Sequence, residues 1–371
     1  MFHPARHRDV PVVRDRIMQS NKLSERGAAL IYVLIAVAAM LGMMGVVFAQ
    51  LSEVRTAIGT WEWTRKARAA AESAIEVAQL KLMDDPAWKV GEDTVPEYDV
   101  ALTDAQARVK TERVRFPDLV KLTAVGRYRG GRGRIERTAQ ITDPTLFALI
   151  AQKRIELEFG TGLWGTASAG EGITIARGVS FKSVTDVPTL ISGKDVTYDV
   201  AYPEVRTYES AGSLPTDALN LDDLKKTYET RIADGTLADI KLAARRLLRD
   251  GSLTIVNGEY SDVSLFVAGD LRMTGSPKFS SKGDTPIIIV EKDFTATFSG
   301  AEISGVIYVA GKVTLRGQAT ITGTIIADEI DVADGVTIQS FQEDPVTKPP
   351  PRSFFKREIR WIDNSTEGRR K

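Results

Sequence analysis

The first pattern in the chain is one uninterrupted run of apolar residues near the N-terminus. Residues 27–49 read GAALIYVLIAVAAMLGMMGVVFA, and the next charged residue downstream is Glu53. As a helix this run would be about 34 Å long, which is enough to cross a hydrocarbon core of about 30 Å. It is apolar on every side, unlike a surface helix of a soluble domain. The run therefore predicts a membrane-spanning helix.

The helical pattern continues beyond this run. From Gln50 to Met83 the chain has no proline and a single glycine, Gly59. Apolar residues recur there at roughly helical spacing: Leu51, Val54, Ile58, Trp61, Ile75 and Leu80. Pro86 then ends the pattern, because proline cannot continue a helix. We expect one long helix over residues 28–86, membrane-like in its first half and amphipathic in its second.

Residues 97–143 change to a two-residue period. Polar and apolar residues alternate, Gly130-Gly131 supplies a turn between two such stretches, and Pro144 closes the segment. Alternation broken by glycine turns is typical of antiparallel strands. The pattern predicts a small antiparallel sheet packed on the end of the long helix.

An internal repeat occupies the second half of the chain. Three stretches align: IIIVEKDFTATFSGAEISG, VIYVAGKVTLRGQATITG and TIIADEIDVADGVTIQ. One apolar column holds Phe294, Val313 and Ile330, a second holds Ile303, Ile321 and Ile338, and a turn column holds Gly300, Gly317 and Gly335. A period of about 17 to 19 residues indicates the rungs of a parallel β-solenoid. We expect this solenoid over residues 144–340, with its strands in about 150–200 and 252–340.

Two further segments do not follow this repeat. Residues 221–233 and 237–248 have helical periodicity, with Thr236 as a candidate N-cap and Gly251 as a candidate C-terminal cap. They predict a helical insertion over residues 214–250 that covers an open end of the solenoid. Residues 341–371 form a proline-rich linker and tail, in which SFFKREIRWID alternates apolar and charged residues. We expect that stretch to add a last strand along the solenoid edge, with an exposed partner-binding strand as the alternative.

The fold class that these patterns predict is α+β. It consists of a long N-terminal transmembrane and amphipathic helix, a small antiparallel sheet, and a parallel β-helix (solenoid) with a helical insertion.

Composition narrows the chemistry. The chain has 49 Lys and Arg against 49 Asp and Glu, so its net charge gives no reason to expect nucleic acid as a partner. The arginines of RYRGGRGR, residues 127–134, are expected to be solvated side chains of a hairpin turn. Cysteine is absent, and both histidines, His3 and His7, precede the apolar run. Removal of the N-terminal segment would leave neither thiol nor imidazole, which excludes most metal sites and acid–base triads. We expect no cofactor and no enzyme activity.

Carboxylate chemistry is the remaining possibility, since β-solenoids also carry enzymes that cleave acidic polysaccharides. Four side chains fall near one turn column of the repeat: Asp270, Asp293, Lys312 and Glu329. Two acids, a lysine and a further acid do not form a repeated acidic row, so we interpret them as a solvated turn. The spacing of Asp328, Asp331 and Asp334 matches no calcium-loop signature.

The N-terminal region resembles the type IV pilin-like proteins, in particular PilX-type minor pilins and related pseudopilins. The resemblance rests on Arg26-Gly27-Ala28-Ala29-Leu30 and on Ala70-Ala71-Glu72-Ser73-Ala74, and covers about the first quarter of the chain. It implies that residues 1–27 are a leader, which a prepilin peptidase cuts between Gly27 and Ala28 before the new N-terminus is methylated. It also implies a helix that stays in inner membrane lipid or packs with other pilins in a filament.

One position departs from the major pilins. They carry glutamate at mature position five, where it neutralises a neighbour's N-terminal amine; here that position is Tyr32. The departure fits PilX-type and pseudopilin relatives that act at or near a filament tip. A leader of 27 residues is long for this family, and Met18 is an alternative start.

Three alternatives follow from the same residues. The run could be a signal peptide cut after Ala49, although it is longer than the usual hydrophobic region. The chain could be a membrane-anchored β-helix that binds or cleaves polysaccharide. It could also be an uncleaved anchor carrying a polymer-forming solenoid. Basic residues before the run, including Lys22 and Arg26, favour a cytoplasmic N-terminus, which would place the C-terminal head in the periplasm or on a surface pilus.

Overall fold

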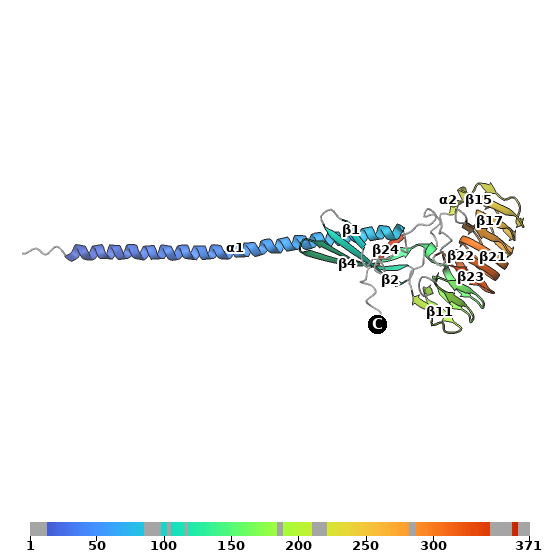
Figure 1. The fold of residues 1–371 in the computed structure, drawn as a ribbon, viewed down its shortest axis with the longest axis horizontal. Coiled ribbons are helices and arrows are strands. Elements are labelled where there is room, and N and C mark those ends of the chain that lie inside the picture. The colour runs from blue at the N-terminus through green and yellow to red at the C-terminus, as the bar shows by residue number, and fades with distance from the viewer. Residues whose placement is uncertain are drawn as a thin grey trace, which may run out of the picture.

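The structure is a computed structural model in which a long helix carries a small sheet and then a large β-solenoid (Figure 1). The description that follows covers residues 13–84, 98–101, 105–115, 118–183, 188–209, 221–281, 287–341 and 358–362. The predicted fold class is confirmed in its main parts: a long helix, a small antiparallel sheet and a parallel solenoid.

Helix α1 spans Val13–Asp84, 72 residues in one piece. At 1.5 Å per residue it is about 108 Å long. The single long helix expected from the sequence is therefore confirmed, and it begins before residue 28, inside the segment assigned to the leader. Only its C-terminal part contacts other elements, because it lies along the small sheet while the rest extends freely (Figure 1).

The small sheet is antiparallel, as expected for residues 97–143. Its strands follow the order β1 (Tyr98–Ala101), β2 (Gln106–Arg115), β3 (Leu119–Tyr128), β4 (Gly131–Thr142) and β24 (Glu358–Ile362). The last strand corrects our expectation for the tail, which we had assigned to the solenoid edge. Ile359 pairs with Ile141 of β4 and packs on the core of this sheet, and the Trp361 ring lies 5.4 Å from the Arg137 guanidinium carbon.

Helix and sheet approach each other unusually closely. The helix turns alanines toward the sheet, and Ala67, Ala71 and Ala74 are fully buried. The sheet places glycines opposite them: a Cβ added to Gly126 would lie 1.9 Å from the Ala67 carbonyl oxygen. One added to Gly133 would lie 2.6 Å from the Arg68 Cα. Only side chains of minimal size on both sides allow this contact.

The solenoid consists of parallel strands stacked in rungs. Residues 210–220 lie outside the described part and divide the solenoid strands into two segments. The earlier segment contributes β5 (Leu149–Leu157), β6 (Gly162–Trp164), β7 (Thr166–Ala169), β8 (Gly172–Ile175), β9 (Ser180–Lys182), β10 (Thr189–Ser192), β11 (Asp195–Tyr198) and β12 (Arg206–Glu209). The later segment contributes β13 (Thr230–Arg231), β14 (Thr236–Ala238), β15 (Lys241–Arg249), β16 (Leu253–Val256), β17 (Glu259–Val267), β18 (Leu271–Gly275), β19 (Lys278–Ser280), β20 (Ile287–Val290), β21 (Phe294–Val309), β22 (Lys312–Val332) and β23 (Val336–Gln339). A 3-10 turn, η1 (Pro144–Leu146), leads into the first of them.

The columns read from the sequence are present in the rungs. Phe294 pairs with Val313, and Ile303 pairs with Ile321, which in turn pairs with Ile338. All of these side chains are buried in one continuous core inside the solenoid. The turn column exists as well: Gly300, Gly317 and Gly335 all have positive φ angles, of 124°, 86° and 87°.

The helical insertion over 214–250 is wrong for the residues that the structure describes. Helix α2 covers only Leu221–Lys226, and Thr236, the proposed N-cap, is the first residue of β14. The segment forms further rungs because Leu242 pairs with Tyr260 and Leu247 pairs with Leu265 of β17. Cross-rung pairing and burial outweigh the helix propensity of a stretch rich in Leu, Ala, Lys and Arg. Residues 214–220 lie outside the described part.

The order of rungs in space differs from their order in the chain. Strand β22 pairs with β5, and β23 pairs with β6, so the last rungs of the chain stack on the first. The chain thus enters the solenoid in the middle, builds one block of rungs (residues 149–209), crosses to the far end and builds a second block (residues 230–339) back toward the middle. We call the contact between the two blocks the junction.

We predict that Gly126→Ala destabilises the head by about 1–3 kcal/mol, because the added Cβ overlaps the backbone of α1. Urea unfolding of the detergent-solubilised chain, followed by far-UV circular dichroism, measures this change. Gly130→Ala is the matched control, since its Cβ would meet only Trp63 ring atoms at an ordinary 3.5 Å. Equal stability of Gly126→Ala and the wild type would contradict the close-packing interpretation.

Candidate functional site

The predicted processing site lies in the free part of α1. The backbone is helical through Gly27 and Ala28, and the segment Ala29–Asp84 that follows is long and apolar enough to cross a membrane. Tyr32, the position-five residue, has a side chain that is 72% exposed. Cleavage and methylation remain predictions, as do the prepilin peptidase, other pilins and inner membrane lipid as partners.

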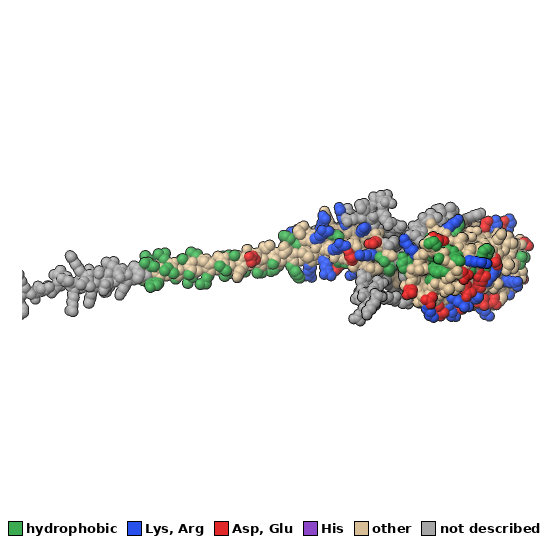
Figure 2. Space-filling view, turned by 90° about the horizontal axis from the view of Figure 1, so that it is seen from below, with side chains coloured by type: hydrophobic (Ala, Val, Ile, Leu, Met, Phe, Trp, Pro, Cys, Tyr) green, Lys and Arg blue, Asp and Glu red, His purple; other side chains and the backbone are tan. Residues whose placement is uncertain are grey.

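The free part of α1 exposes an apolar surface that a helix in water would not keep. The most hydrophobic window of the segment Ala29–Asp84 has a mean hydropathy of 2.6, and none of that window is buried. Its large exposed side chains are Leu30, Ile31, Val33, Leu34, Ile35, Val37, Met40, Leu41, Met43, Met44, Val46, Val47 and Phe48. Figure 2 shows this apolar surface running along the rod outside the head. Such a surface is consistent with membrane anchoring.

The apolar surface continues beyond the run, up to the edge of the head. Leu51, Val54, Ile58 and Trp61 are all more than half exposed. On the same stretch the hydroxyls of Thr56, Thr60 and Thr64 donate hydrogen bonds to helix carbonyls four residues earlier, at 2.8–3.0 Å. A hydroxyl satisfied by its own helix does not need water. This stretch therefore keeps an exposed apolar side and satisfied threonine hydroxyls, while Glu53, Arg55 and Glu62 on the same stretch are charged and exposed.

The carboxylates considered for polysaccharide chemistry have structural partners instead. An Asp270 carboxylate oxygen accepts a hydrogen bond from the backbone N–H of Asp293, at 3.3 Å. An Asp293 oxygen accepts one from the backbone N–H of Lys312, at 2.8 Å. Each acid thus caps the turn of the following rung, as expected for side chains that occupy a turn column of the repeat. The expectation that the protein is not an enzyme stays a prediction.

The other acidic candidates hold the junction between the two blocks. Lys153 of β5 pairs with Asp328 at 2.7 Å, and Arg154 pairs with Glu329 at 3.2 Å. Within the described residues no group of three or more His, Asp and Glu side chains could hold a metal ion. The acids of this region serve as ion-pair partners across a contact that joins residues 175 positions apart.

Asp331 is the most enclosed of these acids, with a side chain that is 10% exposed. It accepts a hydrogen bond from Arg316 at 2.8 Å and lies 3.3 Å from the Lys312 ammonium. Burial raises the pKa of Asp331, but the hydrogen bonds and charges of Arg316 and Lys312 outweigh this effect and leave the pKa below its usual value. Arg316 also pairs with Glu158 at 3.2 Å, so this network too crosses the junction.

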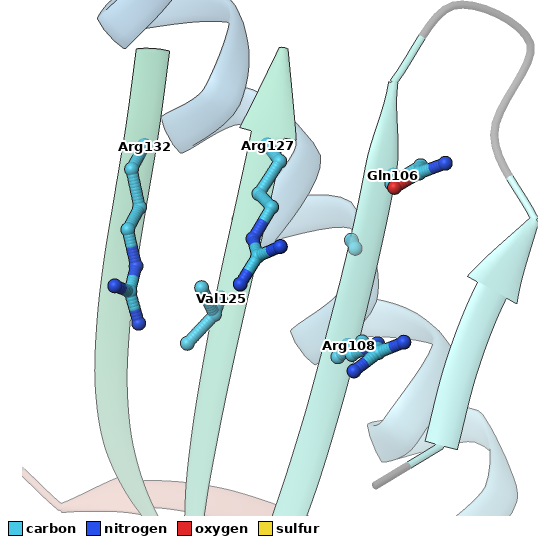
Figure 3. Close-up of a pocket in the computed structure, with 6 residues that line it drawn as sticks. Gln106, Arg108, Val125, Arg127 and Arg132 are labelled. Atoms are coloured by element: carbon cyan, nitrogen blue, oxygen red, sulfur yellow. The ribbon is translucent and has the colours of Figure 1, made fainter. Parts of the chain in front are cut away.

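The basic hairpin of residues 127–134 is where the sequence placed it, at the turn between β3 and β4. Sequence inspection missed that Arg108 of β2 joins it. Arg108, Arg127 and Arg132 line one shallow pocket. Arg127 and Arg132 lie side by side on β3 and β4, and Arg108 lies on β2 opposite Val125, farther along the sheet (Figure 3). No local sequence signal links Arg108 to the hairpin, because the β2–β3 register brings them together.

Comparison with known proteins gives a family match for part of the chain. A family model described as a domain of unknown function (DUF7305) matches residues 229–344. This segment contains the whole second block of rungs, from β13 to β23. No curated protein matches the chain.

Solved structures similar to this chain include a pilin and several ice-binding proteins. The competence-associated pilin ComZ from Thermus thermophilus is 12% identical with a TM-score of 0.43, over 81% of this chain and 98% of ComZ. An ice-binding protein from the Antarctic ascomycete Antarctomyces psychrotrophicus is 12% identical with a TM-score of 0.39, over 53% of this chain and 95% of that one. The DUF3494 domain of a Shewanella frigidimarina ice-binding protein is 13% identical with a TM-score of 0.36, over 53% and 95%.

We predict that Asp331→Asn lowers the free energy of unfolding by about 2 kcal/mol at neutral pH, because Arg316 and Lys312 lose the charge of their shared partner. The folded-state pKa of Asp331 lies below the unfolded value of about 3.9. The contribution is therefore complete above about pH 4 and is lost as the pH falls through the folded-state pKa.

Urea unfolding of the wild type and the variant, between about pH 7 and pH 2, measures both effects. The wild type should lose its advantage in the acid range, and the two curves should converge there. Glu302→Gln is the control, because its pair with Lys278 is exposed and should change stability by no more than about 0.5 kcal/mol. A constant difference at every pH would contradict the assignment to Asp331.

Proposed function

We propose that the protein is a minor, PilX-like subunit of a type IV pilus or a related secretion filament, with a structural or assembly-priming role. A prepilin peptidase removes residues 1–27, and residues 28–49 hold the chain in the inner membrane. The helix then leaves the bilayer to pack with helices of other pilins, while the sheet and solenoid project on the periplasmic side or from the surface pilus.

The free half of α1 is the observation that carries this proposal. A core helix of a soluble protein would be buried, but the apolar window of this helix is not buried at all. Full burial of one large apolar side chain is worth roughly 1.5–3 kcal/mol, so this surface requires lipid or other helices around it. The apolar positions Leu51, Ile58 and Trp61, beyond the span, extend the packing surface past the membrane.

The position-five residue supports a tip or priming place in the filament. In the resembling family a glutamate at that position neutralises the amine of a neighbour, and Tyr32 has no carboxylate to do so. A neighbour's buried amine would stay uncompensated at each such contact, at a cost of several kcal/mol. A subunit used once or a few times per filament avoids repeating that cost along the core.

We predict that Gly27→Leu leaves the leader attached and abolishes incorporation into filaments, because a bulky side chain replaces the residue before the scissile bond. Intact mass and N-terminal sequencing of the protein from its native membrane measure processing. Gly42→Leu is the matched control: its Cβ would meet nothing within 4 Å, and it should be processed normally.

Each start point has a distinct meaning in this experiment. A wild-type chain beginning at methylated Ala28 supports the proposal. A chain beginning at Gln50 indicates ordinary secretion, and an intact leader indicates a plain membrane anchor; either result contradicts the pilin route. Normal processing of Gly27→Leu would contradict the assigned cleavage site.

We also predict that Ile58→Asp reduces the amount of other filament subunits that co-purifies with the protein by at least tenfold. The reason is that a charge on the packing surface would have to be desolvated. The head should keep its urea unfolding curve, since Ile58 is 54% exposed and contributes nothing to the head's core. Val200→Asp, on a solenoid residue that is 46% exposed, is the control and should co-purify normally. Unchanged co-purification of Ile58→Asp would contradict the packing role.

A further inference from the structure

A wide hollow lies at one end of the solenoid, where helix α2 and strand β13 meet strand β15. The residues that line it are Lys225, Lys226, Tyr228, Arg231, Leu248 and Asp250. Helix α2 carries the two lysines in its last turn, and the β13–β15 register places Arg231 opposite Leu248. The hollow has a volume of about 590 Å³, which is in the range of pockets that hold small organic ligands. We call it the end pocket.

The floor of the end pocket is apolar. Tyr228 and Leu248 are both buried and belong to the same core cluster as Phe266 of β17. The Tyr228 ring packs edge-on against the Phe266 ring, with centroids 5.6 Å apart. The Tyr228 hydroxyl is hydrogen-bonded to Ser264, which fixes the orientation of the ring. The bottom of the pocket is therefore a small apolar surface whose shape is set by the solenoid.

The walls of the end pocket carry cations that are only loosely paired. The Lys225 ammonium lies 3.7 Å from a Glu291 carboxylate oxygen, and the Arg231 guanidinium lies 3.7 Å from an Asp250 oxygen. Both distances are too long for a good hydrogen bond. Ion pairs between exposed or half-exposed side chains contribute little to stability, so these two can rearrange at little cost. Lys225 and Arg231 can therefore turn to an anionic ligand.

Asp250 distinguishes the end pocket from a simple anion site. Its side chain is 54% exposed and lies on the same wall as the Arg231 guanidinium. A carboxylate accepts hydrogen bonds from hydroxyl groups, and it repels phosphates and other anions that come close to it. The ligand that suits this pocket therefore carries hydroxyl donors as well as a negative charge.

A sugar acid combines these features. The C–H groups of its ring can pack on Tyr228 and Leu248, as apolar surface does in a protein core. Its hydroxyls can donate hydrogen bonds to Asp250, and its carboxylate matches the planar guanidinium of Arg231 in a bidentate manner. Lys225 adds a second cation, which a flexible side chain can bring to the same carboxylate or to that of the next sugar.

The position of the end pocket does not favour lipid headgroups as its ligand. Asp84, the last residue of α1, is 35 positions after Ala49, the last residue of the apolar run. That length of helix extends about 52 Å, whereas headgroups add only about 5–8 Å to each side of the hydrocarbon core. The end pocket lies in the solenoid beyond this end of α1 (Figure 1), so its ligand comes from the aqueous side.

We infer that the end pocket binds a uronate unit of an acidic polysaccharide. The site differs from the turn column of Asp270 and Asp293, where the sequence suggested polysaccharide chemistry and where these two acids cap turns instead. The inference does not depend on the pilin role, because a filament subunit and a plain membrane anchor would present the same pocket. N-terminal sequencing tests the pilin route separately, so the failure of one proposal is distinguishable from the failure of the other.

The test uses the full chain reconstituted in zwitterionic phosphatidylcholine vesicles, with polygalacturonate as the probe and its methyl ester as the uncharged reference. The wild type should bind polygalacturonate at least about tenfold more tightly than the ester. Lys225→Gln/Arg231→Gln should weaken binding by about tenfold or more, because two charge-assisted contacts are lost. The matched control is Arg272→Gln/Lys278→Gln, which removes two exposed cations elsewhere on the solenoid and should bind as the wild type does.

A third variant separates sugar recognition from attraction by charge alone. Asp250→Ala removes a negative charge, so a simple anion site would bind polygalacturonate more tightly. A site that uses Asp250 for sugar hydroxyls should instead bind it about three- to tenfold more weakly. Urea unfolding checks that each variant keeps the fold.

Three results would overturn the inference. One is unchanged or tighter binding by Asp250→Ala, and another is an equal loss in the control double variant. The third is binding of polyglutamate or of duplex DNA as tight as that of polygalacturonate, which would indicate an acidic peptide or a phosphodiester as the ligand.

Discussion

The close contact between the alanines of α1 and the glycines of the small sheet is the constraint on which the rest of the molecule depends. It fixes the sheet to one side of the helix at Ala67 and Ala71. The free apolar helix, the hairpin turn beside Trp63 and the arginines beyond it all take their positions from that contact. A larger residue at Gly126 or Gly133 would shift the head against the rod that carries it.

The second constraint is the junction within the solenoid. Because β22 stacks on β5, the interior core runs without a break through both blocks, although the chain does not. Thr161 donates a hydrogen bond to the Val332 carbonyl at 3.0 Å. Together with the ion pairs of Lys153, Arg154 and Arg316, it supports a contact between segments that no chain connection holds together.

The sequence predicts those features whose signals are local. The apolar run, the alternation of residues 97–143 and the columns through Val313 and Ile321 are each visible within one or two repeats. The predictions that were wrong or missing concern features that depend on partners distant in the sequence. The stretch at 237–248 has the composition of a helix, but its pairing with residues 255–266 makes it two strands. The β22–β5 contact, the return of β24 to the sheet and the link of Arg108 to the hairpin likewise depend on pairing that no short window reveals. The Gly27–Ala28 processing site is a prediction from the resemblance of residues 26–30 and 70–74 to pilin-like proteins.

The chain enters the solenoid at its middle, not at an end. The connection between the solenoid and the small sheet therefore does not depend on how many rungs the solenoid has. Strands β4 and β24, at the two points where the chain leaves and rejoins the small sheet, lie side by side. The outermost strands, β12 at one end and β13 at the other, are joined directly through the segment containing α2. Rungs added or deleted at either end would leave both connections to the sheet in place. The reach of the head can thus vary during evolution while its mounting stays constant.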